Sequence, residues 1–165
     1  MDDATYQRLL GFGLNYVSLR PRSEKEIRDY VQKKITRWAV SSDLLERVME
    51  RLRELGYVDD LKFAHAFVSS CNQSRPKGAM LLRIELRKKG IDRDCIEEAL
   101  VEADPDTVVS EVDLAQKAAV KKLRGLERYD QRQQRNKLYA FLARRGFSHD
   151  IVSSVIDGLL SKGLQ

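Results

Sequence analysis

Residues 82–91 read LRIELRKKGI and residues 138–147 read LYAFLARRGF, and these two stretches decide the fold of the chain. Two leucines four positions apart, a basic residue, a glycine and an apolar residue recur at the same places in both. The leucine spacing places both side chains on one face of a helix, and the glycine is typical of a helix end. The stretches therefore predict two copies of a helix that ends in a tight turn, which indicates an internal repeat.

The match continues into the segment after each turn. An N-cap residue and an apolar pair four positions apart recur together there, which predicts a second helix in each copy. The residues are Asp92, Asp94, Ile96 and Leu100 in one copy and Ser148, Asp150, Val152 and Ile156 in the other.

A third and weaker copy lies near the N-terminus, where Arg20-Pro21 corresponds to Arg75-Pro76. Ile27, Val31 and Lys34 correspond in the same register to Leu82, Leu86 and Lys89. Residues 35–40 replace the glycine turn here and add about four residues before a cap at Ser42.

The whole chain shows helical spacing of apolar residues, and no segment has the sustained alternation of a strand. Breaks such as Gly56, Gly125 and Asp104-Pro105 divide it into about nine helices. We therefore expect an all-α fold of three tandem three-helix repeats, packed on one another into an elongated, curved array. The expected repeats are residues 1–56, 57–104 and 105–165.

The N-terminal segment, the apolar runs and the cysteines predict a cytoplasmic protein. The N-terminus lacks the basic and apolar regions of a signal peptide, and no run of apolar residues is long enough to span a membrane. Cys71 and Cys95 form no Cys-x-x-Cys pattern, so we interpret both as small buried apolar residues. We expect a monomer that does not contact membranes.

The sequence also argues against an enzyme. Its two histidines, His65 and His149, lie far apart, and no metal-ligand cluster, phosphate loop or nucleophile motif accompanies them. We expect no catalytic residues, no metal and no cofactor, so the chain should act by binding.

Positive charge is concentrated in two segments. Residues 75–90 hold six basic residues and one acid, and residues 121–145 hold nine basic residues and two acids, whereas nine acids and one arginine fall within residues 91–113. Such segregation favours a partner that docks in one orientation, although ion pairs between the repeats could neutralise much of the charge. The candidates for contact with a partner or DNA are Arg75, Lys77, Arg83, Arg87, Lys88, Arg128, Arg132, Arg135, Arg144 and Arg145.

Two further features have alternative interpretations. Arg128, Arg132 and Arg135 would share one face if a single helix ran through all three, and that stripe could follow a phosphate backbone or an acidic groove. Trp38 could stack on a nucleic-acid base, but we favour a packing role in a gap between helices.

Four strings carry a resemblance to a known family through their order and spacing. They are Gly56-Tyr57-Val58-Asp59-Asp60-Leu61-Lys62-Phe63-Ala64, Arg75-Pro76-Lys77-Gly78, Glu85-Leu86-Arg87-Lys88-Lys89-Gly90-Ile91 and Arg144-Arg145-Gly146-Phe147. In the first string we assign Gly56 to a helix end and Asp59 to the cap of the next helix, and Tyr57 or Asp60 could instead touch a partner. With these strings the chain resembles the RecX family, whose members are built from tandem three-helix repeats. It departs from the family in residues 35–40 and in lacking the longer N-terminal extension of many members.

The resemblance implies a regulatory protein of DNA repair. A RecX protein lies in the groove of the RecA filament on single-stranded DNA, bridges adjacent subunits, and limits filament growth, ATP turnover, strand exchange and stimulated repressor cleavage. The RecA filament is therefore the expected partner of this chain, and its basic faces would steer it towards that negatively charged assembly.

The alternative is a direct DNA-binding protein of the tandem helix-turn-helix type. Acids at the expected starts of the third helices argue against it, because they would repel phosphates. These starts are Ser42-Asp43, Asp92-Arg93-Asp94 and Ser148-His149-Asp150. Weak non-specific affinity for single- or double-stranded DNA is compatible with either function.

Overall fold

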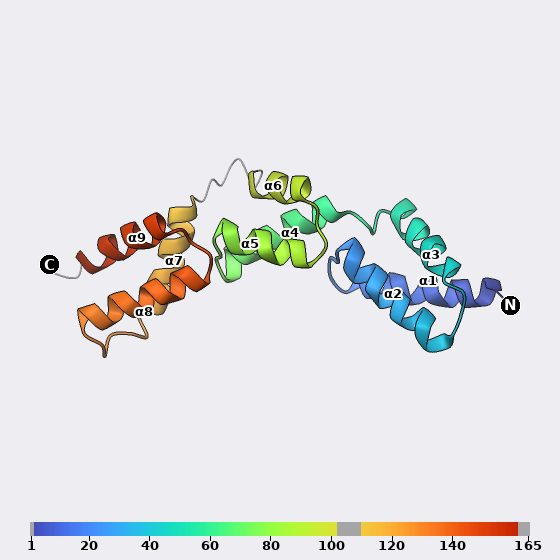
Figure 1. Ribbon diagram of the computed structural model, residues 1–165, viewed down its shortest axis with the longest axis horizontal. Coiled ribbons are helices and arrows are strands. Elements are labelled where there is room, and N and C mark those ends of the chain that lie inside the picture. The colour runs from blue at the N-terminus through green and yellow to red at the C-terminus, as the bar shows by residue number, and fades with distance from the viewer. Residues whose placement is uncertain (1, 102–109, 162–165) are drawn as a thin grey trace. The chain divides into compact units, whose positions relative to one another are not determined.

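The computed structural model describes residues 2–101 and 110–161, and every regular element in these ranges is an α-helix (Figure 1). The helices are α1 (Asp2–Ser18), α2 (Glu24–Trp38), α3 (Asp43–Glu54), α4 (Asp60–Ser74), α5 (Ala79–Lys88), α6 (Arg93–Val101), α7 (Glu111–Leu123), α8 (Gln131–Arg144) and α9 (His149–Ser161). The predicted all-α fold is confirmed. The break predicted at Asp104-Pro105 lies outside the described residues.

Side-chain caps fix where several helices begin. Ser23 accepts a hydrogen bond from the backbone N–H of Glu26, whose carboxylate accepts one from the N–H of Ser23 in return. Asp59 likewise accepts a bond of 2.9 Å from the N–H of Lys62, so its predicted role as a cap is confirmed. Asp130 caps α8 by accepting a bond of 2.8 Å from the N–H of Gln133. These caps satisfy N–H groups that have no partner within the helix.

The turn that ends the second helix of each repeat recurs three times. Gly90 and Gly146 have φ of 86° and 83°, and Ala39 has φ of 53°. After each of them, the next residue donates its N–H to the carbonyl five positions earlier, at 3.1, 3.4 and 3.3 Å. Our expectation that residues 35–40 replace this turn is therefore wrong. The extra residues prolong α2, and Ala39 adopts the left-handed conformation that glycine adopts elsewhere, at a cost of about 1 kcal/mol.

The described chain divides into two compact units. Unit 1 joins residues 2–66 to residues 86–98, and unit 2 joins residues 67–85 to residues 99–101 and 110–161. The boundaries of the three predicted repeats do not coincide with this division, and they stay a prediction.

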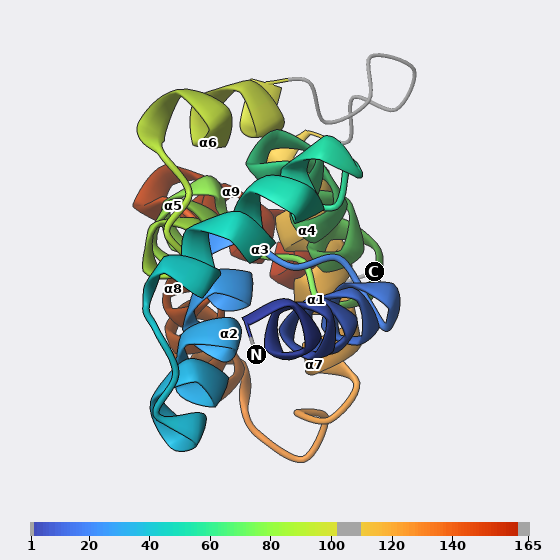
Figure 2. The same cartoon turned by 90° about the vertical axis from the view of Figure 1, so that its right-hand side faces the viewer.

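Each unit has an apolar core between three mutually packed helices. In unit 1 these are α1, α2 and α3, and Figure 2 looks along α1 with α2 and α3 beside it. The core of unit 1 contains Leu9, Ile27, Val31, Ile35, Leu44, Val48, Met49 and Leu52. In unit 2 the helices are α7, α8 and α9, and their core contains Leu114, Ala115, Ala118, Ala119, Leu126, Leu138, Leu142, Phe147, Val152, Val155, Ile156 and Leu160.

Trp38 packs against side chains of α1. The guanidinium of Arg8 lies 4.7 Å from the centre of the Trp38 ring, and the ring of Phe12 meets it edge-on at 5.6 Å between centroids. The next aromatic contact along the two helices is the stack of Tyr16 on Tyr30, at 4.1 Å. These contacts favour the packing interpretation of Trp38, because its neighbours within the chain already occupy positions around the ring.

Candidate anion-binding site

Two corresponding contacts, one in each unit, position the basic side chains. We define the first joint as the contact of residues 23–26 with residues 88–90 in unit 1. Ser23, which is fully buried, donates its hydroxyl to the carbonyl of Lys89 at 2.7 Å. The ammonium of Lys89 in turn donates to Glu26 at 2.8 Å, and the backbone N–H of Glu24 donates to Asp60 at 2.7 Å. Polar side chains therefore fill this joint.

We define the second joint as the contact of residues 76–81 with residues 145–146 in unit 2. Gly78 donates its N–H to the carbonyl of Arg145 at 2.8 Å, and the Arg145 guanidinium donates to the carbonyl of Pro76 at 2.8 Å. The N–H of Ala79 donates to Glu111 at 3.0 Å. A Cβ atom on Gly78 would lie only 2.2 Å from the carbonyl oxygen of Gly146, so the two backbones can meet only because residue 78 is glycine.

The two joints are copies of one arrangement. The register of the sequence repeat places Glu24 on Ala79, and each of these residues donates its N–H to an acid in the first turn of a following helix, Asp60 or Glu111. In the same register Ser23 corresponds to Gly78 and Glu26 to Leu81. The predicted repeat is thus visible in the hydrogen bonding itself.

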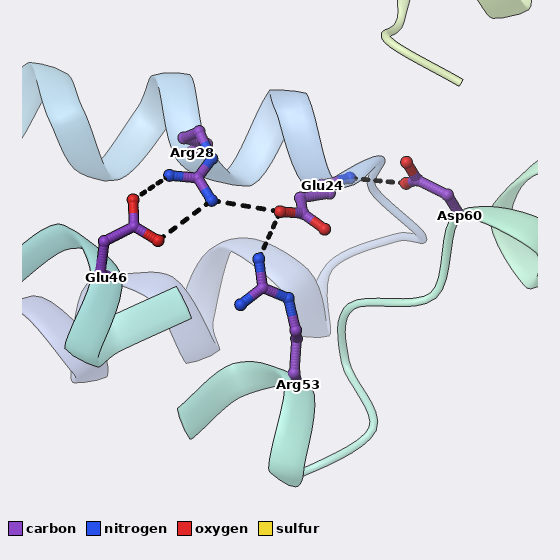
Figure 3. A network of polar contacts seen from close by, with 5 residues as sticks. All are labelled: Glu24, Arg28, Glu46, Arg53 and Asp60. Carbon is purple, nitrogen blue, oxygen red and sulfur yellow. Dashed lines mark hydrogen bonds and ion pairs between the residues drawn. The ribbon is translucent and has the colours of Figure 1, made fainter. Parts of the chain in front are cut away.

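The arginines beside the first joint contact carboxylates of unit 1 (Figure 3). Glu24 accepts hydrogen bonds from Arg28 at 3.2 Å and from Arg53 at 2.5 Å, and Arg28 also pairs with Glu46. Burial alone would raise the pKa of Glu24, but the bonds from Arg53 and Arg28 bring it below its ordinary value. Asp60 is half-buried and accepts the N–H of Glu24 at the start of α2 (Figure 3), which supports the structural interpretation of this residue.

A basic cavity of about 320 Å³ opens beside the second joint. The Arg75-Pro76 turn, the end of α4 and one face each of α7 and α8 form its walls. Five of its lining residues are cations and none is an acid. The lining residues are Gln73, Ser74, Arg75, Pro76, Lys117, Ala118, Lys121, Lys122, Phe141 and Arg145.

The cations of this basic cavity contact neutral groups within the chain. Lys117 donates to the carbonyls at the end of α4, at 3.3 and 3.5 Å, and Lys122 and Arg145 lie over the ring of Phe141 at 5.7 and 4.6 Å. Arg75 and Lys121 are exposed. Burial lowers the pKa of Arg145, and the nearby charge of Arg75 lowers it further. The cavity is therefore a region of unbalanced positive charge that favours an anion.

A second cavity, of about 420 Å³, lies at the corresponding Arg20-Pro21 turn of unit 1. Its lining includes Arg20, Arg22 and Lys62 but also Asp59, which pairs with Lys62 at 3.0 Å. Here the positive charge is partly neutralised. The two cavities share their Arg-Pro turn and differ in the helix opposite it.

The structure brings only Arg75 and Arg145 of the ten predicted contact residues into the basic cavity. Two others are engaged in ion pairs at 2.5 Å, Lys77 with Glu85 and Arg135 with Asp157. Arg83 is half-buried. The other five are exposed, namely Arg87, Lys88, Arg128, Arg132 and Arg144.

The predicted stripe of three arginines on one helix is wrong. α8 begins at Gln131, after the cap at Asp130, so Arg128 precedes the helix. There its guanidinium donates to the hydroxyl of Tyr129 at 3.0 Å. The cap at Asp130 starts the helix later than the arginine spacing predicts.

The sequence reasoning missed Lys117, Lys121 and Lys122 as site residues. Lys117 and Lys121 lie one helical turn apart, which was a usable signal for a shared basic face. Their meeting with Arg75 and Arg145 depends on tertiary packing, which no local pattern in the sequence shows.

The other titratable groups of the described residues include two free thiols, Cys71 and Cys95. Within residues 2–101 and 110–161, no group of three or more His, Cys, Asp or Glu side chains is arranged to hold a metal ion. Burial raises the pKa of Cys71, and burial with the nearby Asp92 raises the pKa of Cys95 to about 11, so both thiols are protonated at neutral pH. None of the helices in the described part of the chain is both long and apolar enough to cross a membrane.

Comparison with known proteins identifies the family. Residues 59–100 match the second three-helix domain of RecX and residues 110–156 match the third. A protein of Prosthecochloris aestuarii named "Regulatory protein RecX" is 36% identical over 161 residues, which cover 98% of this chain and 99% of that protein. The chain belongs to the RecX family.

Further relatives support this assignment. The RecX protein of Chlorobium phaeobacteroides is 35% identical over 95% of this chain and 97% of its own length. The RecX protein of Bacillus subtilis is 35% identical, and there the match spans about half of the relative, 52%. A crystal structure of RecX from Lactobacillus salivarius superposes with a TM-score of 0.72 at 25% identity, covering 93% of this chain and 96% of that one. The tandem three-helix architecture and the resemblance seen in the sequence are both confirmed.

Proposed function

We propose that this RecX-family chain binds the RecA filament on single-stranded DNA and lowers its ATPase, strand-exchange and co-protease activities. Membership of a family whose relatives are named regulatory proteins supports this function. The observation that carries it is the basic cavity, where five cations surround an opening without any acid. A filament that bears DNA is negatively charged, so this surface would attract it. On this proposal the protein works in the cytoplasm as a monomer, by binding and without catalysis.

The exposed arginines outside the basic cavity extend the proposed contact surface. Arg87 lies near the end of α5 and Arg132 in the first turn of α8, and both side chains are exposed. Exposed cations at the rim of an interface mainly raise the rate of association and its dependence on salt. We therefore assign them to steering, and the cavity to closer contact.

An ATPase assay with RecA on single-stranded DNA tests the proposal. Substoichiometric protein should lower ATP turnover, and the double variant R87E/R132E should require several-fold more protein for the same effect. The control is K62E/R93E, which changes the net charge equally at two exposed positions of unit 1. Unchanged ATP turnover at a stoichiometric excess of the wild-type chain would exclude the proposed function.

Direct reading of duplex DNA is the less supported function. The third helices of the repeats carry acids in their first turns, at Asp43, Asp94 and Asp150. Recognition helices contact bases through residues near their N-termini, where these carboxylates would repel the DNA phosphates. Sequence-selective duplex binding at about nanomolar affinity in the absence of RecA would reverse this preference.

A further inference from the structure

We infer that the basic cavity of unit 2 binds the phosphodiester backbone of single-stranded nucleic acid directly, through Arg75, Lys117, Lys121, Lys122 and Arg145. The inference deepens the proposed function by naming the component of the filament that the cavity contacts. It rests on that proposal only for its biological setting, because the cavity would bind a free single strand as well.

The first argument is the local charge balance. At the first joint some basic side chains face carboxylates, as Lys89 faces Glu26 and Arg28 faces Glu46. In the basic cavity the cations contact backbone carbonyls and an aromatic ring, which leave their charge in place. Five such charges around one opening repel one another, and a bound anion would relieve that repulsion.

The second argument is the type of cation. Three of the five are lysines, whose ammonium groups act as compact point charges and suit phosphate oxygens from many directions. An acidic peptide would be held better by the paired N–H groups of arginine forks, yet only two of the five cations are arginines, and Arg145 already donates to Pro76 and lies over Phe141. Lys117 and Lys121 are separated by about 6 Å along α7, which suits a chain of repeating anions. The cavity therefore favours a phosphate backbone over a protein carboxylate.

The third argument is the shape of the site. A cavity of about 320 Å³ with the ring of Phe141 in its wall admits a flexible strand, whereas a duplex would need a helix that enters its groove. Grooves that bind single strands place cations along the path of the backbone, as this one does.

The cavity at Arg20-Pro21 in unit 1 provides an internal comparison. It has the same Arg-Pro turn and a larger volume, about 420 Å³, but Asp59 pairs with Lys62 in its wall. The Arg-Pro turn is thus common to both cavities, and volume does not favour the one in unit 2. Only the cavity in unit 2 has the lysines of α7, so only that cavity is assigned to nucleic acid.

Fluorescence anisotropy of a labelled oligothymidine strand, titrated with the full chain without RecA, tests the inference. The double variant K121E/K122E should bind at least about tenfold more weakly at low salt, because two phosphate contacts become repulsive. Loss of two contacts should also reduce the slope of log affinity against log salt by about 1.4. Both side chains are exposed, and far-UV circular dichroism should show an unchanged helix content.

The matched control is again K62E/R93E, which carries the same change of net charge and should keep at least about half of the wild-type affinity. Equal losses in the two double variants would mean that overall charge, and not the cavity, attracts the strand, which overturns the inference. If polyglutamate binds through Lys121 and Lys122 while K121E/K122E leaves oligothymidine binding unaffected, the cavity would be assigned to an acidic protein segment instead. A duplex that binds as tightly and depends equally on these lysines would refute the single-strand assignment.

Parallel measurements separate this inference from the proposed function. If the wild-type chain leaves RecA ATP turnover unchanged but binds oligothymidine through Lys121 and Lys122, the proposed function fails and the inference stands. If the wild-type chain inhibits RecA but binds no oligothymidine, the inference fails and the proposed function stands.

Discussion

The two joints use the same backbone arrangement and stabilise it in different ways. At the first joint, Ser23 and Glu26 fill the contact with hydrogen-bonded side chains, and Lys89 is neutralised by Glu26. At the second joint, Gly78 and Leu81 stand at the corresponding positions, so the backbones meet directly and no carboxylate faces Arg145 from that position. Arg145 corresponds to Lys89 in the repeat. Because a glycine and a leucine replace Ser23 and Glu26 at the second joint, Arg145 keeps its charge and lies in the wall of the basic cavity.

This difference shows that counting charges in a segment does not measure the charge that a partner can reach. Residues 75–90 and 121–145 are both strongly basic, yet Lys77 and Arg135 form ion pairs within the chain. A surface ion pair contributes little stability, but it reduces the local potential that a partner meets. The accessible charge therefore lies where the acids of the repeat have been lost, which is at the second joint.

Substitution of Gly78 by Ala should have the largest effect, because it tests whether close backbone contact holds the second joint. The new Cβ would meet the carbonyl of Gly146, a backbone group that cannot rotate away, so we expect the free energy of unfolding to fall by about 3 kcal/mol. Urea denaturation followed by circular dichroism measures this loss. Gly11→Ala is the control, because open space surrounds Gly11 within α1 and the substitution should stabilise the helix by about 0.5 kcal/mol. Equal stability of the two variants would contradict the role of the backbone contact.

Ser23→Ala should have an intermediate effect, because it tests the polar filling of the first joint. The variant loses the cap to the N–H of Glu26 and leaves the carbonyl of Lys89 without its hydroxyl donor, so we expect a loss of about 2 kcal/mol. Ser18→Ala, which removes an exposed bond to Asn15, should change stability by less than about 0.5 kcal/mol in the same denaturation experiment. If Ser23→Ala lowers the free energy of unfolding no more than Ser18→Ala does, the first joint depends on apolar packing alone.

The sequence predicted the repeat and the helices well, because both depend on local spacing and on glycines such as Gly90 and Gly146. It did not predict the turn at Ala39, since only the backbone conformation shows that an alanine occupies the left-handed position. For the site, Arg75 and Arg145 were predicted and the lysines of α7 were not. Their proximity comes from the packing of segments more than forty residues apart, as in the bond from Lys117 to the carbonyl of Gln73.

Acid should weaken the first joint and spare the second, and this is the smallest of the expected effects. Burial alone would raise the pKa of Glu26, but bonds from Lys89 and the N–H of Ser23 bring it below its ordinary value of 4.5. A carboxyl whose pKa is lowered by folding stabilises the fold above its unfolded pKa and loses that contribution as the pH falls through the folded pKa. We expect a loss of less than about 1 kcal/mol, because water partly screens the pair.

Hydrogen exchange with mass spectrometry, at pH values from neutral down to below 4.5, can resolve this effect in the two joints. After correction for intrinsic exchange rates, protection of residues 23–31 should decrease relative to residues 78–86. Glu26→Gln should reduce this pH dependence, and two opposed contributions then remain in the same region, because, despite burial, the pKa of Glu24 is lowered by its bonds from Arg53 and Arg28 whereas burial raises the pKa of Asp60. Leu81 occupies the position of Glu26 in the second joint and cannot titrate, so an equal loss of protection there would mean that acid acts through other groups, such as Glu111, and not through Glu26.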